Sequence, residues 1–202
     1  MFQPKAIPGV DEMLGQFREV GHDLFTQGLV SCQSGNLSVR IGEQLVITHR
    51  GSTLGSIAQA DLVETGIERN DRATPLASTE LAVHRSIYRK TPALAVVHAH
   101  PPYSVALSFV EEEIVPVDLE GQSLLSRVPV LGKGMALKPA DLADEIAEGL
   151  LRHKVVLVHS HGSFAASQLL EEAYYYTSLL EQSCRLIYLL KMLRASSGNG
   201  EG

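Results

Sequence analysis

Two short apolar runs, each followed by a pair of histidines, constrain the fold of this chain more than any other feature. The first run, residues 93–98, ends within the segment Val96-Val97-His98-Ala99-His100. The second run, residues 155–158, is followed directly by His159-Ser160-His161. Uninterrupted apolar runs of this length are typical of strands that are buried on both faces. The histidines stand where each predicted strand ends, which is where sheets commonly form binding sites.

Other periodic patterns predict helices and a hairpin around these two strands. Apolar residues spaced three and four apart predict an amphipathic helix over residues 10–29. Further helices are predicted over residues 78–89, with Ser78 or Thr79 as the cap, and over 139–152 and 169–193. Gly42-Glu43 predicts a hairpin of residues 37–41 and 44–48. Residues 61–67 are a further candidate strand, and Val-rich segments follow at 115–117 and 128–130.

The irregular order of helices and strands favours a mixed, mostly antiparallel sheet covered by helices over a strict βαβ repeat. A length of 202 residues suits one domain with a full core. We find neither an internal repeat nor an interdomain linker. The sequence therefore predicts a single domain over residues 1–202, with a disordered tail at 196–202.

Composition and charge exclude several classes of partner. The net charge is −6, and acidic and basic residues are mixed without a basic stripe, so we expect no nucleic-acid partner. Cys32 and Cys184 lack CxxC spacing and are predicted to be small buried hydrophobes. Residues 1–5 lack an apolar signal core, and no run approaches the ~20 apolar residues of a membrane span. We expect a cytoplasmic protein without a membrane partner.

The histidine pairs predict a metal site. Residues two apart on a strand face the same side, so His98 and His100 should project together as half of a transition-metal site. A lone pair of this kind is more often one core and one surface histidine, but a second pair makes packing a weak explanation. Three imidazoles with an open position are typical of a catalytic metal site. Alternation leaves open whether His159 or His161 is the third ligand, and His49 and His84 are further possible contributors.

A carboxylate and several small polar turns accompany the histidines. Alone, Glu80 at the start of a helix would only stabilise that helix, but beside a metal it becomes a candidate acid–base group. Ser78 and Thr79 are then candidate anion ligands at the helix N-terminus. The turns Ser34-Gly35-Asn36 and Thr48-His49-Arg50-Gly51-Ser52 offer further donors, although hairpins and loops use the same residues.

Taken in order, these segments resemble the class II aldolase/adducin family, which includes fuculose-phosphate aldolases and ribulose-phosphate epimerases. The resemblance runs from the first helix to about Leu193. The segments that carry it are Ser34-Gly35-Asn36-Leu37-Ser38, Ile47-Thr48 through Gly51, Ser78-Thr79-Glu80, Val97-His98-Ala99-His100 and His159-Ser160-His161-Gly162.

The resemblance implies a fold, a metal and an assembly. It implies a three-layer α/β/α domain with a mainly antiparallel sheet, in a homotetramer with active sites at subunit interfaces. The implied ligands are His98, His100 and His161, because the family's third ligand directly precedes the glycine. The metal would be zinc first, with manganese, iron or cobalt next. Glu80 would be the catalytic acid–base and would also be a candidate metal ligand when substrate is absent. Phosphate would be held by Gly35, Asn36, Gly51, Ser78 and Thr79.

The implied reaction is cleavage of a phosphorylated ketose to dihydroxyacetone phosphate and a small aldehyde through a metal-stabilised enediolate. His49-Arg50 stands where the fuculose-phosphate aldolase has Pro-Thr, so Arg50 is a further candidate phosphate ligand. Residues 117–121 lack the tyrosine found there in that aldolase, and its longer C-terminal tail is missing. The alternatives are a metal-dependent decarboxylase, a sugar-phosphate epimerase, and a non-catalytic interaction module like adducin.

Overall fold

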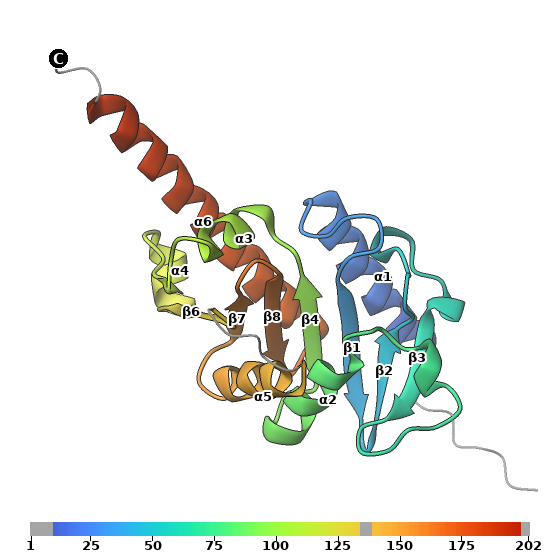
Figure 1. The fold of residues 1–202 in the computed structure, drawn as a ribbon. Coiled ribbons are helices and arrows are strands. Elements are labelled where there is room, and N and C mark those ends of the chain that lie inside the picture. The colour runs from blue at the N-terminus through green and yellow to red at the C-terminus, as the bar shows by residue number, and fades with distance from the viewer. Residues whose placement is uncertain (1–9, 134–138, 199–202) are drawn as a thin grey trace, which may run out of the picture.

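A mixed sheet forms the middle layer of the part of the chain that this computed structural model describes, residues 10–133 and 139–198 (Figure 1). Its strands are β1 (Asn36–Ile41), β2 (Gln44–Thr48), β3 (Leu62–Gly66), β4 (Ala95–Ala99), β5 (Glu113–Ile114), β6 (Val128–Leu131), β7 (Val155–Val158) and β8 (Gly162–Ser167). The described strands lie in the order β3-β2-β1-β4-β8-β7-β6-β5. Neighbouring strands are antiparallel except for the parallel pair β6 and β7. The predicted mixed, mainly antiparallel sheet is confirmed.

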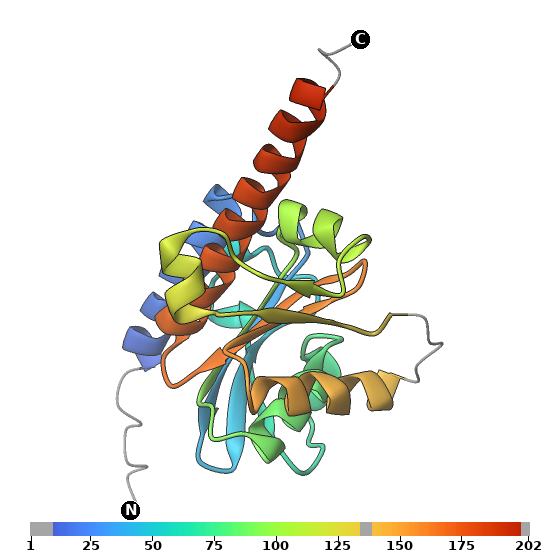
Figure 2. The same ribbon diagram turned by 90° about the vertical axis from the view of Figure 1, so that its left-hand side faces the viewer.

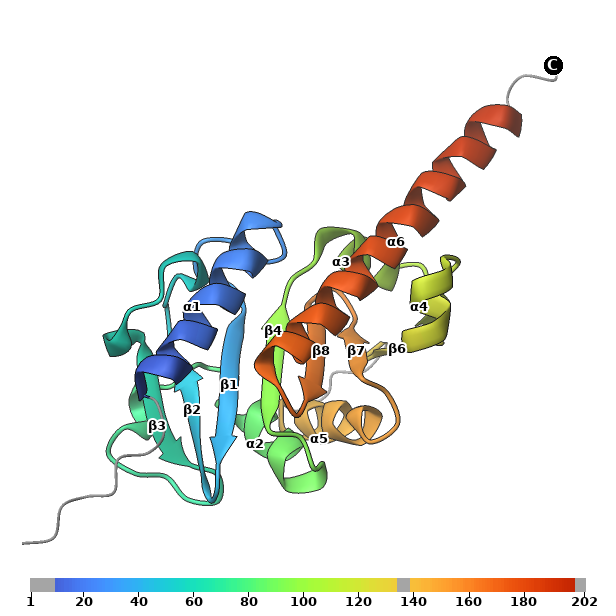
Figure 3. The same ribbon diagram turned by 180° about the vertical axis from the view of Figure 1, so that it is seen from behind.

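Helices cover both faces of the sheet, so the predicted three layers are also confirmed. The helices are α1 (Val10–Thr26), α2 (Leu81–Lys90), α3 (Pro102–Ser108), α4 (Leu119–Leu124), α5 (Pro139–Leu150) and α6 (Leu170–Gly198). Figure 3 shows α1 and α6 across one face, and Figure 2 shows α2 and α5 on the other. Val97 and Leu157 point into the core beneath α1 and α6, whereas Val96 and Phe164 point into the core beneath α2 and α5.

The strand β8, which was not predicted, determines how the two apolar strands are related. It lies between β4 and β7 and runs antiparallel to both. As a result, β4 and β7 run in the same direction and end at the same edge of the sheet. The segment Gly162-Ser163-Phe164-Ala165-Ala166-Ser167 is rich in small residues with weak strand preference, which is why its pattern escaped prediction.

Two short helices were also missed, and one cap was wrong. Pro102, expected only to stop a strand, occupies the first turn of α3, where its missing N–H is not needed. The helix α4 is also short, and residues 115–117 form no strand. Helix α2 begins at Leu81 with Glu80 as its N-cap, so neither Ser78 nor Thr79 caps it.

The predictions for the C-terminal residues and the two cysteines are confirmed only in part. Helix α6 includes residues 196–198, where a disordered tail was predicted, and residues 199–202 lie outside the described part of the chain, as do residues 1–5. Cys184 is fully buried as expected, but Cys32 is exposed because it lies in the polar turn before β1. Among the described helices, none is both long and apolar enough to cross a membrane.

Candidate metal centre

Three histidines converge at the edge of the sheet where β4 ends and β8 begins. His98 belongs to β4, His100 follows it, and His161 immediately precedes β8. Their potential ligand atoms all lie within 4.8 Å of one another, and the Nε2 atoms of His98 and His100 are 2.9 Å apart. The structure thus brings together the three residues that the family resemblance selected.

The ring of His98 is fixed from behind. It is 1% exposed and stacks on Phe164, the residue of β8 that pairs with it in the sheet, with ring centroids 4.1 Å apart. His98 Nδ1 donates a hydrogen bond to the Ser163 carbonyl oxygen at 2.9 Å. Burial lowers the pKa of His98 to about 3, so the ring is neutral. Its Nε2 lone pair therefore faces the site, which is the tautomer that a metal requires.

His159 and His161 do not form a second strand-end pair, and this part of the interpretation was wrong. Ser160 has a φ of 57°, in the left-handed region, which converts the segment into a tight turn between β7 and β8. The turn sends His159 Nδ1 to the Ser108 carbonyl oxygen at 2.9 Å, while His161 turns toward the other two histidines. The turn, rather than strand alternation, separates the two roles.

The residue after His161 has to be glycine. A Cβ atom at Gly162 would lie 2.3 Å from the Ala99 carbonyl oxygen and 2.9 Å from Cδ2 of the His100 ring. Neither distance is tolerable, so any larger residue would force β4 and β8 apart and displace His100. Gly162 is therefore needed for the close approach of β4 and β8 beside His100 and His161.

Glu80 completes the cluster from the start of α2. Its Oε1 lies 3.2 Å from His161 Nε2, and its Oε2 lies 3.5 Å from His98 Nε2. Burial alone would raise the pKa of Glu80, but the hydrogen bond with His161 and the positive charges that the histidines can carry lower it to about 2. Glu80 is therefore a carboxylate at neutral pH.

The cluster has the polar groups that a cation needs. Glu80 Oε2 is buried and has no hydrogen-bond partner among the described residues. It faces His98 Nε2, which also carries a lone pair because the ring proton is used on Ser163. Two such acceptors face each other unfavourably unless a positive charge lies between them. The donor set of three imidazoles and one carboxylate therefore fits a divalent metal ion.

The histidines and Glu80 form one end of a pocket of about 210 Å³. It is lined by Gln33, Ser34, Gly35, Asn36, His49, Arg50, Gly51, Ser52, Ser78, Thr79, Glu80, His98, His100 and His161. Every residue predicted for the site is in this set, although their roles stay predictions. His49, a possible ligand by sequence, lines the pocket, but its Nδ1 contacts the Arg50 carbonyl oxygen at 2.5 Å. His84 is fully buried and lines no part of it.

Backbone contacts hold the polar wall of this pocket against the histidines. Ser78 N donates to the Thr48 carbonyl oxygen at 3.1 Å, and His49 pairs with Ala77 in an isolated β-bridge. Gly35 has a φ of 77°, and a Cβ atom there would lie 2.8 Å from the His98 carbonyl oxygen. These contacts place the turn before β1 and the loop after β2 beside the start of α2.

The contacts of Phe164 and Ser163 with the His98 ring were not predicted from the sequence, because the strand β8, to which both residues belong, was missed.

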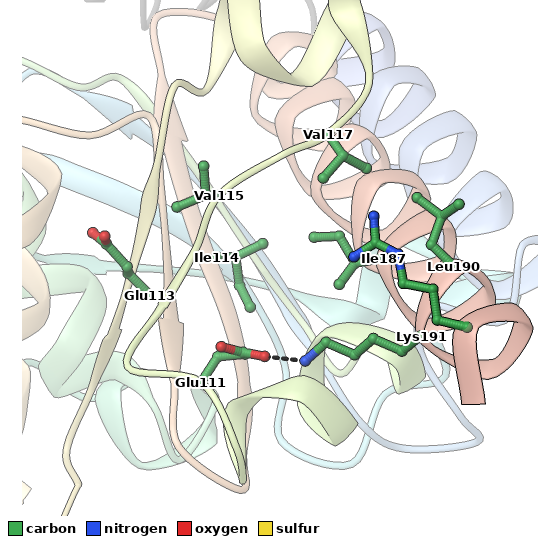
Figure 4. Close-up of a pocket in the computed structure, with 9 residues that line it drawn as sticks. Glu111, Glu113, Ile114, Val115, Val117, Ile187, Leu190 and Lys191 are labelled. Atoms are coloured by element: carbon green, nitrogen blue, oxygen red, sulfur yellow. Dashed lines mark hydrogen bonds and ion pairs between the residues drawn. The ribbon is translucent and has the colours of Figure 1, made fainter. Parts of the chain in front are cut away.

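A second pocket, away from the histidines, lies against the C-terminal half of α6. Ile114, Val117 and Ile187 form its apolar walls, and Glu111 pairs with Lys191 across it (Figure 4). It contains no histidine and no group suited to a metal beyond the two rim carboxylates. Of these two pockets, the one at the end of β4 combines three histidines with a carboxylate.

The sheet order, the three converging histidines and the adjacent carboxylate define a class of protein. The family described as "Class II Aldolase and Adducin N-terminal domain" matches residues 16–188, and the chain belongs to this family. It is an enzyme of the class II aldolase superfamily.

Individual relatives point to more than one reaction. A crystal structure of l-fuculose-1-phosphate aldolase from Thermus thermophilus is similar with a TM-score of 0.85 and 38% identity, over 91% of this chain and 97% of that one. L-fuculose phosphate aldolase of Methanocaldococcus jannaschii is 29% identical, over 86% of this chain and 94% of its own length. A 3-oxo-tetronate 4-phosphate decarboxylase of Haemophilus influenzae is 26% identical, over 86% and 85% respectively. The superfamily is thus established, and the exact reaction is not set by similarity.

Proposed function

We propose that this protein is a metal-dependent aldolase that cleaves a phosphorylated ketose to dihydroxyacetone phosphate and a small aldehyde. The observation that supports this most directly is the position of Glu80. Its carboxylate lies within 3.5 Å of two histidines of the cluster, in a pocket whose other lining residues are rich in hydrogen-bond donors. A base next to a metal site, with an anion site beyond it, suits a small phosphorylated substrate.

His98, His100 and His161 would hold the ion, which we propose to be zinc, with manganese, iron or cobalt as the next candidates. When bound, such an ion polarises the carbonyl of a hydroxy-ketone and stabilises the negative charge that develops as the carbon–carbon bond breaks. The imidazoles are suited to this because Ser163 and Phe164 fix the orientation of His98 before any ligand binds.

Glu80 would move the proton at the carbon next to the carbonyl. With its pKa lowered to about 2, Glu80 is ionised at neutral pH, which is the form of a carboxylate that can accept a proton. Its position at the N-cap of α2 places it in the favourable field of a helix N-terminus, which stabilises the carboxylate further. The free Oε2 atom leaves it one acceptor that no protein group occupies among the described residues.

The phosphate would bind at the polar end of the pocket. The glycines at its turns leave backbone N–H groups accessible, and side chains add neutral and charged donors. The residues proposed to bind phosphate are Gly35, Asn36, Arg50, Gly51, Ser78 and Thr79.

Decarboxylation is the second candidate. The similarity to a 3-oxo-tetronate 4-phosphate decarboxylase favours it, and that protein's name describes a substrate with both a phosphate and a carboxylate. Arg50, which lines the pocket and carries a full positive charge, suits either anion. In both reactions the pocket has to stabilise the same kind of negative charge on an oxygen next to the breaking bond.

The metal site is tested by metal analysis of purified histidine variants. We expect about one divalent ion per chain in the wild type. His98→Ala, His100→Ala and His161→Ala should each lose most of it, because each removes one of three imidazoles. His159→Ala is the matched control, since His159 contacts Ser108 and turns away from the cluster. Full retention of metal in the His161 variant would show that the wrong histidine was selected.

The reaction is tested by a panel of ketose phosphates and a phosphorylated 3-oxo acid, offered to the metal-loaded protein. An aldolase should release dihydroxyacetone phosphate from a ketose phosphate, act poorly on the free sugar, and be inhibited by phosphoglycolohydroxamate. Arg50→Ala should narrow the gap between phosphorylated and free sugar. Release of carbon dioxide from the 3-oxo acid without ketose cleavage would overturn the aldolase proposal in favour of the decarboxylase.

We also propose that the protein assembles as a homotetramer with active sites at subunit interfaces. The C-terminal half of α6 projects well beyond the body of the domain (Figures 1 and 3). Leu186, Leu189, Leu190 and Leu193 recur on it at three- and four-residue intervals and are 37–64% exposed. A stripe of this kind on a free helix is typical of a surface that packs against another helix.

A further inference from the structure

A chain of four buried polar side chains runs from helix α2 to the wall of the metal pocket. Tyr88 Oη lies 2.7 Å from Ser38 Oγ, which lies 2.6 Å from His84 Nδ1. On the other side of the ring, His84 Nε2 lies 2.5 Å from Asn36 Oδ1. None of the four residues is more than 5% exposed, and of the four only Asn36 lines the pocket.

The direction of hydrogen bonding follows from the phenol at the inner end. Burial raises the pKa of Tyr88, so the phenol keeps its proton, and Ser38 is its hydrogen-bond partner among the described residues. A buried hydroxyl proton without an acceptor is costly, so Tyr88 donates to Ser38, and Ser38 in turn donates to His84 Nδ1. The single proton of the neutral His84 ring is then on Nε2 and is donated to Asn36 Oδ1.

We propose that Tyr88, Ser38 and His84 form a positioning relay that turns the Asn36 amide oxygen inward and its NH₂ group toward the pocket. The pocket then presents a donor at this point, which selects an anionic oxygen of the substrate over a hydroxyl or ammonium proton. The proposal rests on the phosphate site proposed above and assigns one of its donors. His84, a possible metal ligand by sequence, is in this reading a positioning residue that acts through Asn36.

Two features favour positioning over packing alone. Every group in the relay has its partner except Asn36 Nδ2, which makes no hydrogen bond among the described residues and belongs to the pocket wall. The buried groups of the chain are fully paired, as such a chain requires, and the one donor left over lies at the pocket wall, where a ligand can reach it. In addition, Asn36 pairs with His98 in the sheet, and His84 follows Glu80 by one helical turn. The relay therefore aligns the donor with the metal ligand and the base.

Two nearly isosteric variants of His84 test the relay. His84→Gln keeps an amide N–H at the ε position that reaches Asn36, whereas His84→Asn places its amide at the δ position and loses that bond. We measure the Kd of inorganic phosphate and the KM and kcat for a ketose phosphate with metal-loaded full-length protein. His84→Gln should stay within about threefold of the wild type, and His84→Asn should weaken phosphate binding about tenfold with a smaller effect on kcat. Metal content should be unchanged in both.

A double-mutant cycle distinguishes the relay from a general structural effect. In an Asn36→Ala background the two His84 variants should bind phosphate equally, because the group on which the relay acts is gone. Equal losses in both single variants, or a difference that persists without Asn36, would overturn the relay. If His84→Asn does not fold, Ser38→Ala takes its place, with the loss expected only while Asn36 is present.

The ring tautomer tests the relay independently of catalysis. Nitrogen chemical shifts of His84 should report a neutral ring with its proton on Nε2, and a proton on Nδ1 would overturn the relay alone. A metal-loaded wild type that binds no phosphate would overturn both the relay's assigned ligand and the proposed function. The two failures are therefore distinguishable.

Discussion

At the scale of single residues, Glu80 combines two roles that a substitution can separate. Glu80→Gln keeps the size of the side chain and most of its hydrogen bonding but removes its capacity to accept a proton. We expect activity to fall by roughly a hundredfold or more, because a positioned base contributes that much. Metal content should change far less than in the histidine variants, since all three imidazoles remain. Nearly unchanged turnover would mean that Glu80 only stabilises the start of α2.

His84 should make the stability of the metal-free protein depend on pH. Burial lowers its pKa to about 4, from 6.5, so the unfolded state binds this proton more readily than the folded state. Its contribution to stability is therefore complete above pH 6.5 and is lost as the pH falls toward 4. Between pH 7 and pH 5 the wild type should lose about 2 kcal/mol more than His84→Gln, measured by urea unfolding. Equal losses in the two proteins would contradict a buried neutral imidazole.

At the scale of elements, the turn between β7 and β8 decides which histidine enters the site. Ser160 holds a left-handed backbone conformation, which a β-branched residue adopts only with strain. Ser160→Val should cost about 1–3 kcal/mol of unfolding free energy and weaken metal binding, because His161 is displaced. Ser160→Gly is the matched control and should bind metal like the wild type. A valine variant with native stability and native metal affinity would show that the turn does not position His161.

The same elements explain what the sequence could predict. The strand β4 was predictable because its apolar run ends at His98, and alternation placed His98 and His100 on one side. The divergence of His159 and His161 was not predictable from alternation, because it depends on one positive φ at Ser160. The strand β8 was missed because alanine, serine and glycine dominate it, so the support behind His98 was missed with it. Order along the chain, through the family resemblance, selected His161 where local pattern could not.

At the scale of the whole molecule, the projecting end of α6 should control assembly. Leu189→Glu combined with Leu193→Glu places two charges within its exposed apolar stripe. Because buried charges without partners are costly, we expect the tetramer to dissociate to smaller species in sedimentation experiments. Ala195→Glu adds a charge to the opposite side of the same helix, where residue 195 is exposed, and should leave the assembly intact. A monomeric wild type would contradict the proposed assembly.

The insertion of β8 between β4 and β7 also has a consequence for the rates of folding and unfolding. The chain between His100 and His161 contains α3, α4, β5, β6, α5 and β7, so these two side chains meet only after a long loop has closed and β8 has paired with β4. Closing long loops is slow, and contacts that form late contribute little to the folding barrier. An ion held by all three histidines would therefore leave the refolding rate nearly unchanged and would mainly slow unfolding. In this fold the metal would extend the lifetime of the native state rather than guide the chain toward it.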